Sequence, residues 1–211
     1  PQRNPTGACS VKRLVDATVV GLCAASWAIA EWVIRDSSGP GDLVVYRHTS
    51  RLLDAGFVPY RDFDVEYPPL ATGLFWVVDR IPGSDTRAWS IAMLACLIAT
   101  ALSAVAAART LGYRPARQLS AGAIVAATPL LLGGLVANRY DLVVAALLGG
   151  VLVVALRRKM GWAWTLLAIA TAIKSTPLVV APVLMIWHLR QRGARQALVG
   201  TSAFAAAVAA A

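Results

Sequence analysis

The sequence lacks the residue patterns that mark several common classes of protein. It has only three cysteines, Cys9, Cys23 and Cys96, two of which lie inside apolar segments, so no disulfide framework is indicated. It contains no His-Glu-x-x-His, no Cys-x-x-Cys, no glycine-rich phosphate loop and no serine-centred elbow. We therefore expect no cofactor and no dedicated metal site, while its acidic residues leave a divalent metal ion compatible with the sequence.

Charged residues are also scarce, and their signs are unequal. Of 211 residues only 15% are charged, with 20 Lys and Arg against 11 Asp and Glu, whereas 58% are hydrophobic and the mean hydropathy is +0.63. This composition is typical of integral membrane proteins. The net charge of +9 does not indicate nucleic-acid binding, because the arginines form short clusters between apolar segments, as in polytopic proteins.

The apolar segments predict an all-α, polytopic membrane protein. A spanning helix needs about 20 apolar residues. The predicted spans are 16–34, 88–108, 119–136, 142–156, 162–173, 177–189 and 197–211. The first is expected to be a retained anchor, because it has no small-x-small exit. We expect residues 1–211 to form a single transmembrane domain, the N-terminal part of a longer protein, because the sequence stops inside an apolar run.

Four basic clusters test this count of spans. They are Lys12-Arg13; Arg109, Arg114 and Arg117; Arg157, Arg158 and Lys159; and Arg190, Arg192 and Arg195. With these spans, all four basic clusters lie on one side of the membrane. The positive-inside rule identifies this side as cytoplasmic, so the N-terminus is expected to be cytoplasmic too. Residues 69–81 are too short to span and are predicted to form a helix at the membrane interface. Residues 35–87 then form an outer loop.

This outer loop holds eight of the 11 acidic residues, between positions 36 and 87. Residues 43–55 are predicted to form an amphipathic helix that rests on the lipid headgroups, with Val45, Thr49 and Leu52 on one face and Gly56 as its stop. Asp42 precedes this helix. It can be the helix N-cap, or a general base that takes a proton from an acceptor hydroxyl at the membrane surface.

The acidic residues Asp62, Asp64 and Glu66 alternate along the loop. In an extended segment they would project to the same side, where like charges repel unless a cation, an arginine or sugar hydroxyls meet them. A solvated acidic loop is the simpler alternative. Tyr67 precedes two prolines and is expected to be extended.

Two further polar segments, Asn138-Arg-Tyr-Asp141 and Lys174-Ser-Thr-Pro177, fall on the same predicted side. Their cations, Arg139 and Lys174, break the positive-inside pattern and suit an anion site, because both residue types bind phosphate. The alternatives are that Arg139 and Asp141 cap helix ends or pair, and that Lys174 snorkels to the headgroups. We expect the three polar segments to converge on one outer surface.

The motifs resemble a known family. Gly41-Asp-Leu-Val-Val-Tyr46, Leu53-Asp-Ala-Gly-Phe-Val-Pro-Tyr60 and Phe63-Asp-Val-Glu-Tyr-Pro-Pro69 are similar to the first outer loop of GT-C glycosyltransferases. The nearest group is the bacterial α-mannosyltransferase-like enzymes that use polyprenyl-phosphate mannose, glycosyltransferase family 87. The resemblance covers residues 14 to about 90, and the two later polar segments are similar with less specificity. It implies a GT-C-like helix bundle whose outer first loop carries short interfacial helices.

The resemblance also implies a reaction. A sugar, mannose by analogy, would pass with inversion from a polyprenyl-phosphate donor to a lipid or glycan acceptor on the outer face of the bacterial plasma membrane. Asp42 would be the base. Cations would stabilise the leaving phosphate. The residues expected to bind the donor phosphate are Arg139, Lys174 and Arg61, and those expected to bind sugar or acceptor are Asp62, Asp64, Glu66, Tyr67 and Asp141.

Two other functions compete with this interpretation. A transporter or flippase of lipid-linked intermediates would need charged or broken segments near the middle of the bilayer, whereas the predicted mid-helix positions are apolar. A non-catalytic assembly subunit would tolerate loss of Asp42. Membrane lipids are expected partners in every case, and nucleic acid is not.

Overall fold

The computed structural model describes residues 5–34, 41–81, 86–133, 136 and 139–210. Within these residues the regular structure is helical and no strand occurs, which confirms the predicted all-α fold. The elements are α1 (Pro5–Ile34), α2 (Leu43–Asp54), α3 (Pro69–Asp79), α4 (Thr86–Thr110), α5 (Pro115–Ala126), α6 (Thr128–Leu132), α8 (Asp141–Leu156), α9 (Met160–Ile173), the 3₁₀ helix η1 (Thr176–Val180), α10 (Ala181–Arg192) and α11 (Ala194–Ala209).

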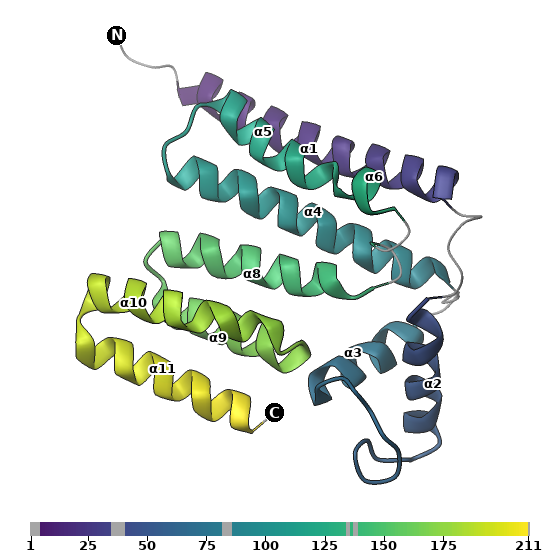
Figure 1. Ribbon diagram of the computed structural model, residues 1–211. Helices are drawn as coiled ribbons and strands as arrows, with labels where there is room; N and C mark the ends of the chain where they lie inside the picture. Colours follow the sequence, from purple (N-terminus) through teal and green to yellow (C-terminus); the bar gives the residue numbers. More distant parts are fainter. Residues whose placement is uncertain (1–4, 35–40, 82–85, 134–135, 137–138, 211) are drawn as a thin grey trace.

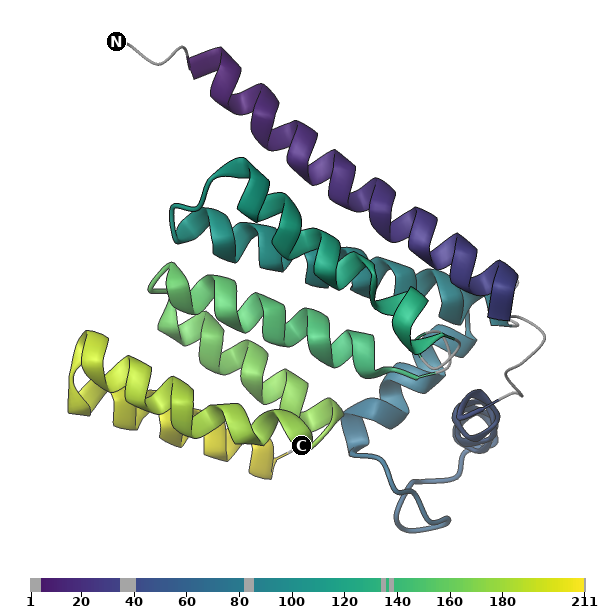
Figure 2. The same ribbon diagram turned by 45° about the horizontal axis from the view of Figure 1, so that its top comes forward.

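The long helices lie side by side, so successive connections fall at alternate ends of the bundle (Figures 1 and 2). The connections after α4, α8 and α10 lie at the end where the N-terminus lies, and these carry the predicted basic clusters. The opposite end holds α2, α3 and the connections before α8 and after α9. The expected separation of basic clusters from acidic segments is therefore present in the fold.

Among the residues that the structure describes, two helices are long and apolar enough to cross a membrane: Cys9–Val33 within α1 and Arg87–Thr110 within α4. The helices α3, α8 and α9 are apolar but shorter. With 11 residues, α3 is about 16 Å long, well short of a hydrocarbon core of about 30 Å. The composition and these two helices indicate membrane association, and the further spans stay predictions.

The apolar stretch 119–136 does not form one continuous helix. α5 ends at Ala126 and α6 begins at Thr128. The cause is Pro129, which has no N–H and whose ring would collide with the carbonyl of Val125 in a straight helix. The Thr128 hydroxyl donates a hydrogen bond of 2.6 Å to this same carbonyl. The stretch is therefore bent near its middle, which the sequence pattern did not predict.

The chain is interrupted between the predicted segments 162–173 and 177–189. α9 ends at Ile173, Lys174 is extended (φ −150°, ψ 134°), and η1 precedes α10. Because this connection is short, it returns the chain to the bundle directly and leaves Lys174 at the end of the bundle that also holds α2 and α3.

The predicted helix at 43–55 is also confirmed, and Gly56 follows it with φ +86°. The residues of α2 that are buried in the protein are Leu43, Tyr46, Thr49 and Ser50, because α2 packs against α3. Val45 is 46% exposed, and the contact of its face with lipid headgroups stays a prediction.

α4 lies at the centre of the bundle and packs against α1, α5 and α8. The approach of α8 to α4 depends on Gly149, where an added Cβ would lie 2.8 Å from Cβ of Ser103. Small residues of this kind let membrane helices pack closely.

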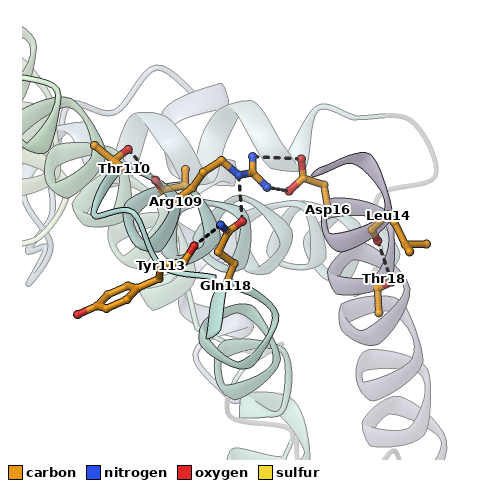
Figure 3. Close-up of polar contacts among 8 residues, drawn as sticks. Leu14, Asp16, Thr18, Arg109, Thr110, Tyr113 and Gln118 are labelled. Carbon is orange, nitrogen blue, oxygen red and sulfur yellow. Dashed lines mark hydrogen bonds and ion pairs between the residues drawn. The ribbon is translucent and has the colours of Figure 1, made fainter. Parts of the chain in front are cut away.

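A polar network joins α1, α4 and α5 at the basic end (Figure 3). Arg109 donates to Asp16 at 2.7 Å and through Nε to Gln118 at 3.1 Å, and Gln118 donates to the carbonyl of Tyr113 at 2.7 Å. Gln118 is buried. The guanidinium therefore satisfies polar groups of two other helices, one of them buried.

We expect Arg109→Met to destabilise the protein by about 1–3 kcal/mol, because it leaves the Asp16 carboxylate and the Gln118 carbonyl unpaired. Thermal unfolding of the detergent-solubilised protein measures this. The matched control is Arg114→Met, which removes the same charge at an exposed position of the same end and should change stability by less than about 0.5 kcal/mol. Equal stability of the two variants would contradict a structural role for the network.

Candidate active site

Asp42 stands at the N-cap position of α2, but its side chain makes no capping hydrogen bond. Its backbone carbonyl accepts the first helical hydrogen bond from Tyr46 N at 3.1 Å. The carboxylate instead lies 3.3 Å from Nε of Arg139 and accepts a long hydrogen bond of 3.5 Å from the Tyr46 hydroxyl. The helix position is thus as predicted, while the side chain faces a cation from a segment far away in the chain.

Tyr46 anchors this arrangement through a cluster of aromatic rings. It is 1% exposed and stacks on Phe75 of α3 with a centroid distance of 4.2 Å. It also contacts the rings of Trp89, Tyr67 and Tyr140 at centroid distances of 5.2, 5.7 and 5.7 Å. The cluster fixes α2, the Tyr67 segment, α3, the start of α4 and the connection before α8 relative to one another.

Lys174 forms an ion pair with Asp141 at the first residue of α8 and lies 5.2 Å from the centroid of the Tyr140 ring. This pair connects the end of α9 to the start of α8. The alternative in which Arg139 pairs with Asp141 is not what is observed, because each cation faces a different carboxylate.

These groups surround one cavity of about 220 Å³. Four separate parts of the chain line it: the start of α2, the segment before α3, the segment before α8 and the segment after α9. The lining residues are Asp42, Tyr46, Glu66, Tyr67, Pro68, Arg139, Tyr140, Asp141, Lys174, Ser175 and Thr176. The structure thus brings together six of the nine residues predicted for the site, as the expected convergence requires. Asn138 lies outside the described residues.

Burial and nearby carboxylates keep the cavity tyrosines protonated. Burial, and then the neighbouring tyrosines and carboxylates, raises the pKa of Tyr140 to about 12, and burial is also the main cause of the raised pKa of Tyr67. The pKa of Tyr46 is raised further for the same reasons. Their hydroxyls therefore remain neutral hydrogen-bond donors at physiological pH, and the charge of the cavity comes from three carboxylates and two cations.

Three predicted site residues, Arg61, Asp62 and Asp64, do not line the cavity. Residues 59–63 form a tight turn, with Tyr60 at φ +63°, rather than the extended segment expected. Arg61 donates to both carboxylate oxygens of Asp62, at 2.9 and 2.8 Å, and Val58 N donates to Asp62 at 2.7 Å. These donors lower the pKa of Asp62. Asp62 therefore does not project to the same side as Glu66, because its carboxylate accepts a hydrogen bond from the backbone of the turn.

Asp54 joins the two helices that carry the cavity wall. It accepts hydrogen bonds from Trp76 Nε1 at 2.8 Å and from Arg80, whose guanidinium lies 4.1 Å from the Trp76 ring centroid. Arg80 first, and then Trp76, lower the pKa of Asp54. The contact holds the end of α2 against the end of α3.

The described residues include no group of three or more His, Cys, Asp and Glu side chains that could hold a metal ion. The carboxylates of the cavity are matched by Arg139 and Lys174 instead. The chemistry that this arrangement supports is acid–base catalysis and anion binding.

Sequence reasoning missed Tyr46, Pro68, Tyr140, Ser175 and Thr176 as lining residues. A signal existed for Tyr46, which follows Asp42 by four residues and so lies on the same face of a helix. Tyr140 lies between two predicted site residues. Nothing in the pattern distinguished Ser175 and Thr176 from ordinary residues of a connection.

Comparison with known proteins decides the family. The model of glycosyltransferase family 87 matches residues 66–211, well over half of the chain. The chain belongs to glycosyltransferase family 87. No curated protein and no solved structure matches it. The family assignment confirms the resemblance noted in the sequence and shows a glycosyltransferase.

The family 87 match overlaps the resemblance noted for residues 14 to about 90 and extends over the later polar segments, where the resemblance was less specific. It starts at Glu66 and so includes Tyr67 and the segments that carry Arg139 and Lys174. Asp42 and Tyr46 precede it. They are linked to the matched region by their contacts with Arg139, Phe75 and Tyr140.

The Asp54 contact predicts a pH dependence of the loop. Because the folded-state pKa of Asp54 lies below its ordinary value of 3.8, the contact stabilises the loop above that value and is lost as pH falls through the folded pKa. We expect hydrogen exchange of α2 amides, corrected for intrinsic rates, to accelerate on acidification below about pH 4 in the native protein. In Asp54→Asn the acceleration beyond intrinsic rates should be absent. If the acceleration persisted in this variant, another carboxylate would be its cause.

Proposed function

We propose that this family 87 chain transfers mannose from a polyprenyl-phosphate donor to a hydroxyl of a lipid or glycan acceptor, with inversion at the anomeric carbon. The observation that carries the proposal is the placement of Asp42 in one cavity with two cations, Arg139 and Lys174, drawn from distant segments. A base and a phosphate site next to each other are what such a transfer requires.

Asp42 is the proposed general base. The acceptor hydroxyl gives its proton to the carboxylate while its oxygen attacks the anomeric carbon from the face opposite the phosphate. The Asp42 side chain is 39% exposed, so an acceptor can reach it. The protonated Tyr46 hydroxyl, 3.5 Å away, keeps the carboxylate oriented toward the cavity.

Arg139 and Lys174 are the proposed partners of the leaving phosphate. As the bond between the anomeric carbon and the phosphate oxygen breaks, that oxygen keeps the electron pair and gains negative charge, which nearby cations stabilise. The pair with Asp42 engages Nε of Arg139, so the terminal guanidinium nitrogens are able to donate to phosphate oxygens. Lys174 adds a point charge from the segment after α9.

Glu66, Tyr67 and Asp141 are the proposed ligands of sugar or acceptor hydroxyls, since they supply acceptors and a neutral donor around the same cavity. Arg61, Asp62 and Asp64 are not part of the proposal, because the first two bind each other and none of the three lines the cavity.

The proposed orientation follows from charge. The end with the four basic clusters faces the cytoplasm of a bacterial plasma membrane, and the cavity opens at the outer surface. A polyprenyl chain in the outer leaflet would then bring its phosphate to the depth of Arg139 and Lys174. The predicted spans would form a GT-C-like bundle.

Asp42→Asn tests the base. We expect it to lower the rate of sugar transfer from polyprenyl-phosphate mannose by about 10²–10⁴-fold, measured with radiolabelled donor and the protein in proteoliposomes. The matched control, Asp79→Asn, makes the same change in the same loop outside the cavity and should retain activity. Activity retained in Asp42→Asn would remove Asp42 from the mechanism. Movement of the labelled lipid without a new glycosidic bond would favour the transporter instead.

The cations are tested by Arg139→Gln and Lys174→Gln. Each should lower kcat by about 10²–10³-fold, because each removes charge that stabilises the leaving phosphate. The control is Arg51→Gln, an exposed arginine on α2 that does not line the cavity. A change in KM for the donor with unchanged kcat would limit the two residues to ground-state binding. Loss of activity in the control to the same degree would show a general electrostatic effect of the loop.

A further inference from the structure

A second, larger cavity lies away from the candidate active site. It is an open groove of about 1190 Å³ between α9, α10 and α11. Its opening at the basic end is formed by Arg158, Lys159, Arg192 and Arg195, and its walls are mostly apolar. The proposed transfer of sugar makes no use of it.

The walls of the groove are held in a defined arrangement. Trp164 on α9 donates a hydrogen bond of 3.0 Å to Nδ1 of His188 on α10 and packs against Phe204 on α11 at a centroid distance of 5.5 Å. α11 approaches closely because position 200 is glycine, where an added Cβ would lie 2.5 Å from Nε1 of Trp164. These contacts hold the three helices that form the groove in close packing.

The charge at its opening has no counter-charge nearby. From Leu142 to Ala211 the sequence has seven Lys and Arg residues and no Asp or Glu. Of these seven, Lys174 pairs with Asp141 at the other end of the bundle. Among the described residues, none of the four cations at the groove forms an ion pair with a carboxylate. An anionic ligand would supply the charge that this part of the protein lacks.

The shape of the groove fits a ligand with a long apolar part. Its lining runs along α11 from Arg195 to Ala207, a distance of about 18 Å at 1.5 Å per residue. Half of a hydrocarbon core is about 15 Å thick. An acyl chain that starts at the basic opening would therefore follow the groove through about one leaflet, past apolar residues such as Ile169 and the 65% exposed Trp162.

We propose that this groove binds an anionic phospholipid, with its phosphate among Arg158, Lys159, Arg192 and Arg195 and one acyl chain between α9 and α11. Basic pockets between membrane helices bind anionic headgroups in this way. A neutral lipid would leave the four cations unneutralised, and a free phosphate would leave the apolar walls uncovered. The proposal depends on membrane association but not on the proposed sugar transfer, so each can fail without the other.

The test measures quenching of tryptophan fluorescence by brominated lipids, because Trp162 and Trp164 line the groove. The full chain is reconstituted in phosphatidylcholine vesicles that contain increasing fractions of phosphatidylglycerol brominated on its acyl chains. We expect a saturable component of quenching at low phosphatidylglycerol fractions, and none with brominated phosphatidylcholine at equal fractions. Trp162→Phe should reduce this component, which would place the lipid in the groove.

Two double variants separate the groove from general attraction to the membrane surface. Arg192→Gln with Arg195→Gln removes two groove cations and should raise the half-saturating fraction by about 10-fold or more. Arg157→Gln with Arg190→Gln removes two cations from the same connections that do not line the groove, and should shift it by less than about 2-fold. The proposal would be overturned if both double variants shifted the half-saturating fraction equally, or if both brominated lipids quenched equally. Absence of saturable quenching, as expected if another segment covers the groove, would also overturn it.

Discussion

The geometry of the candidate active site depends on the burial of Tyr46. One ring contacts residues from α3, α4, the segment before α3 and the segment before α8, so these parts of the chain are fixed relative to α2. Aromatic pairs contribute about 0.5–1.5 kcal/mol each beyond the area they bury. Because Asp42 lies one helical turn before Tyr46, the same contacts that hold α2 also hold the carboxylate opposite Arg139.

The two ends of the bundle differ in how charge is balanced. At the cavity, each cation is paired with a carboxylate from another segment, which lets five charged side chains share about 220 Å³. At the basic end, the Arg109 network is balanced by Asp16, but the groove between α9 and α11 has cations alone. In the two proposals made above, the first end carries out the sugar transfer and the second end binds lipid.

Several sequence expectations held because they rest on local physics. Apolar length predicted α1 and α4, Gly56 was predicted as the stop of α2, and the separate apolar segments 162–173 and 177–189 correspond to α9 and to η1 with α10. Other features were not readable from the pattern. α3 covers the side of α2 that carries Tyr46, and residues 59–63 fold back into a turn, so Asp62 does not line the cavity with Glu66. The bend at Pro129 was overlooked because the hydropathy of residues 119–136 indicated one continuous apolar span.

The sequence by itself determined that this protein is helical and membrane-associated, and that its basic clusters and acidic segments fall on opposite sides, since these properties follow from composition and from the alternation of connections. Only the tertiary structure decided which charges meet. Asp42 and Arg139 are 97 positions apart, and a pairing over that separation is set by how helices pack and not by spacing along the chain. Arg61 and Asp62 pair with each other and do not line the cavity. The packing of helices also produced the basic groove between α9, α10 and α11.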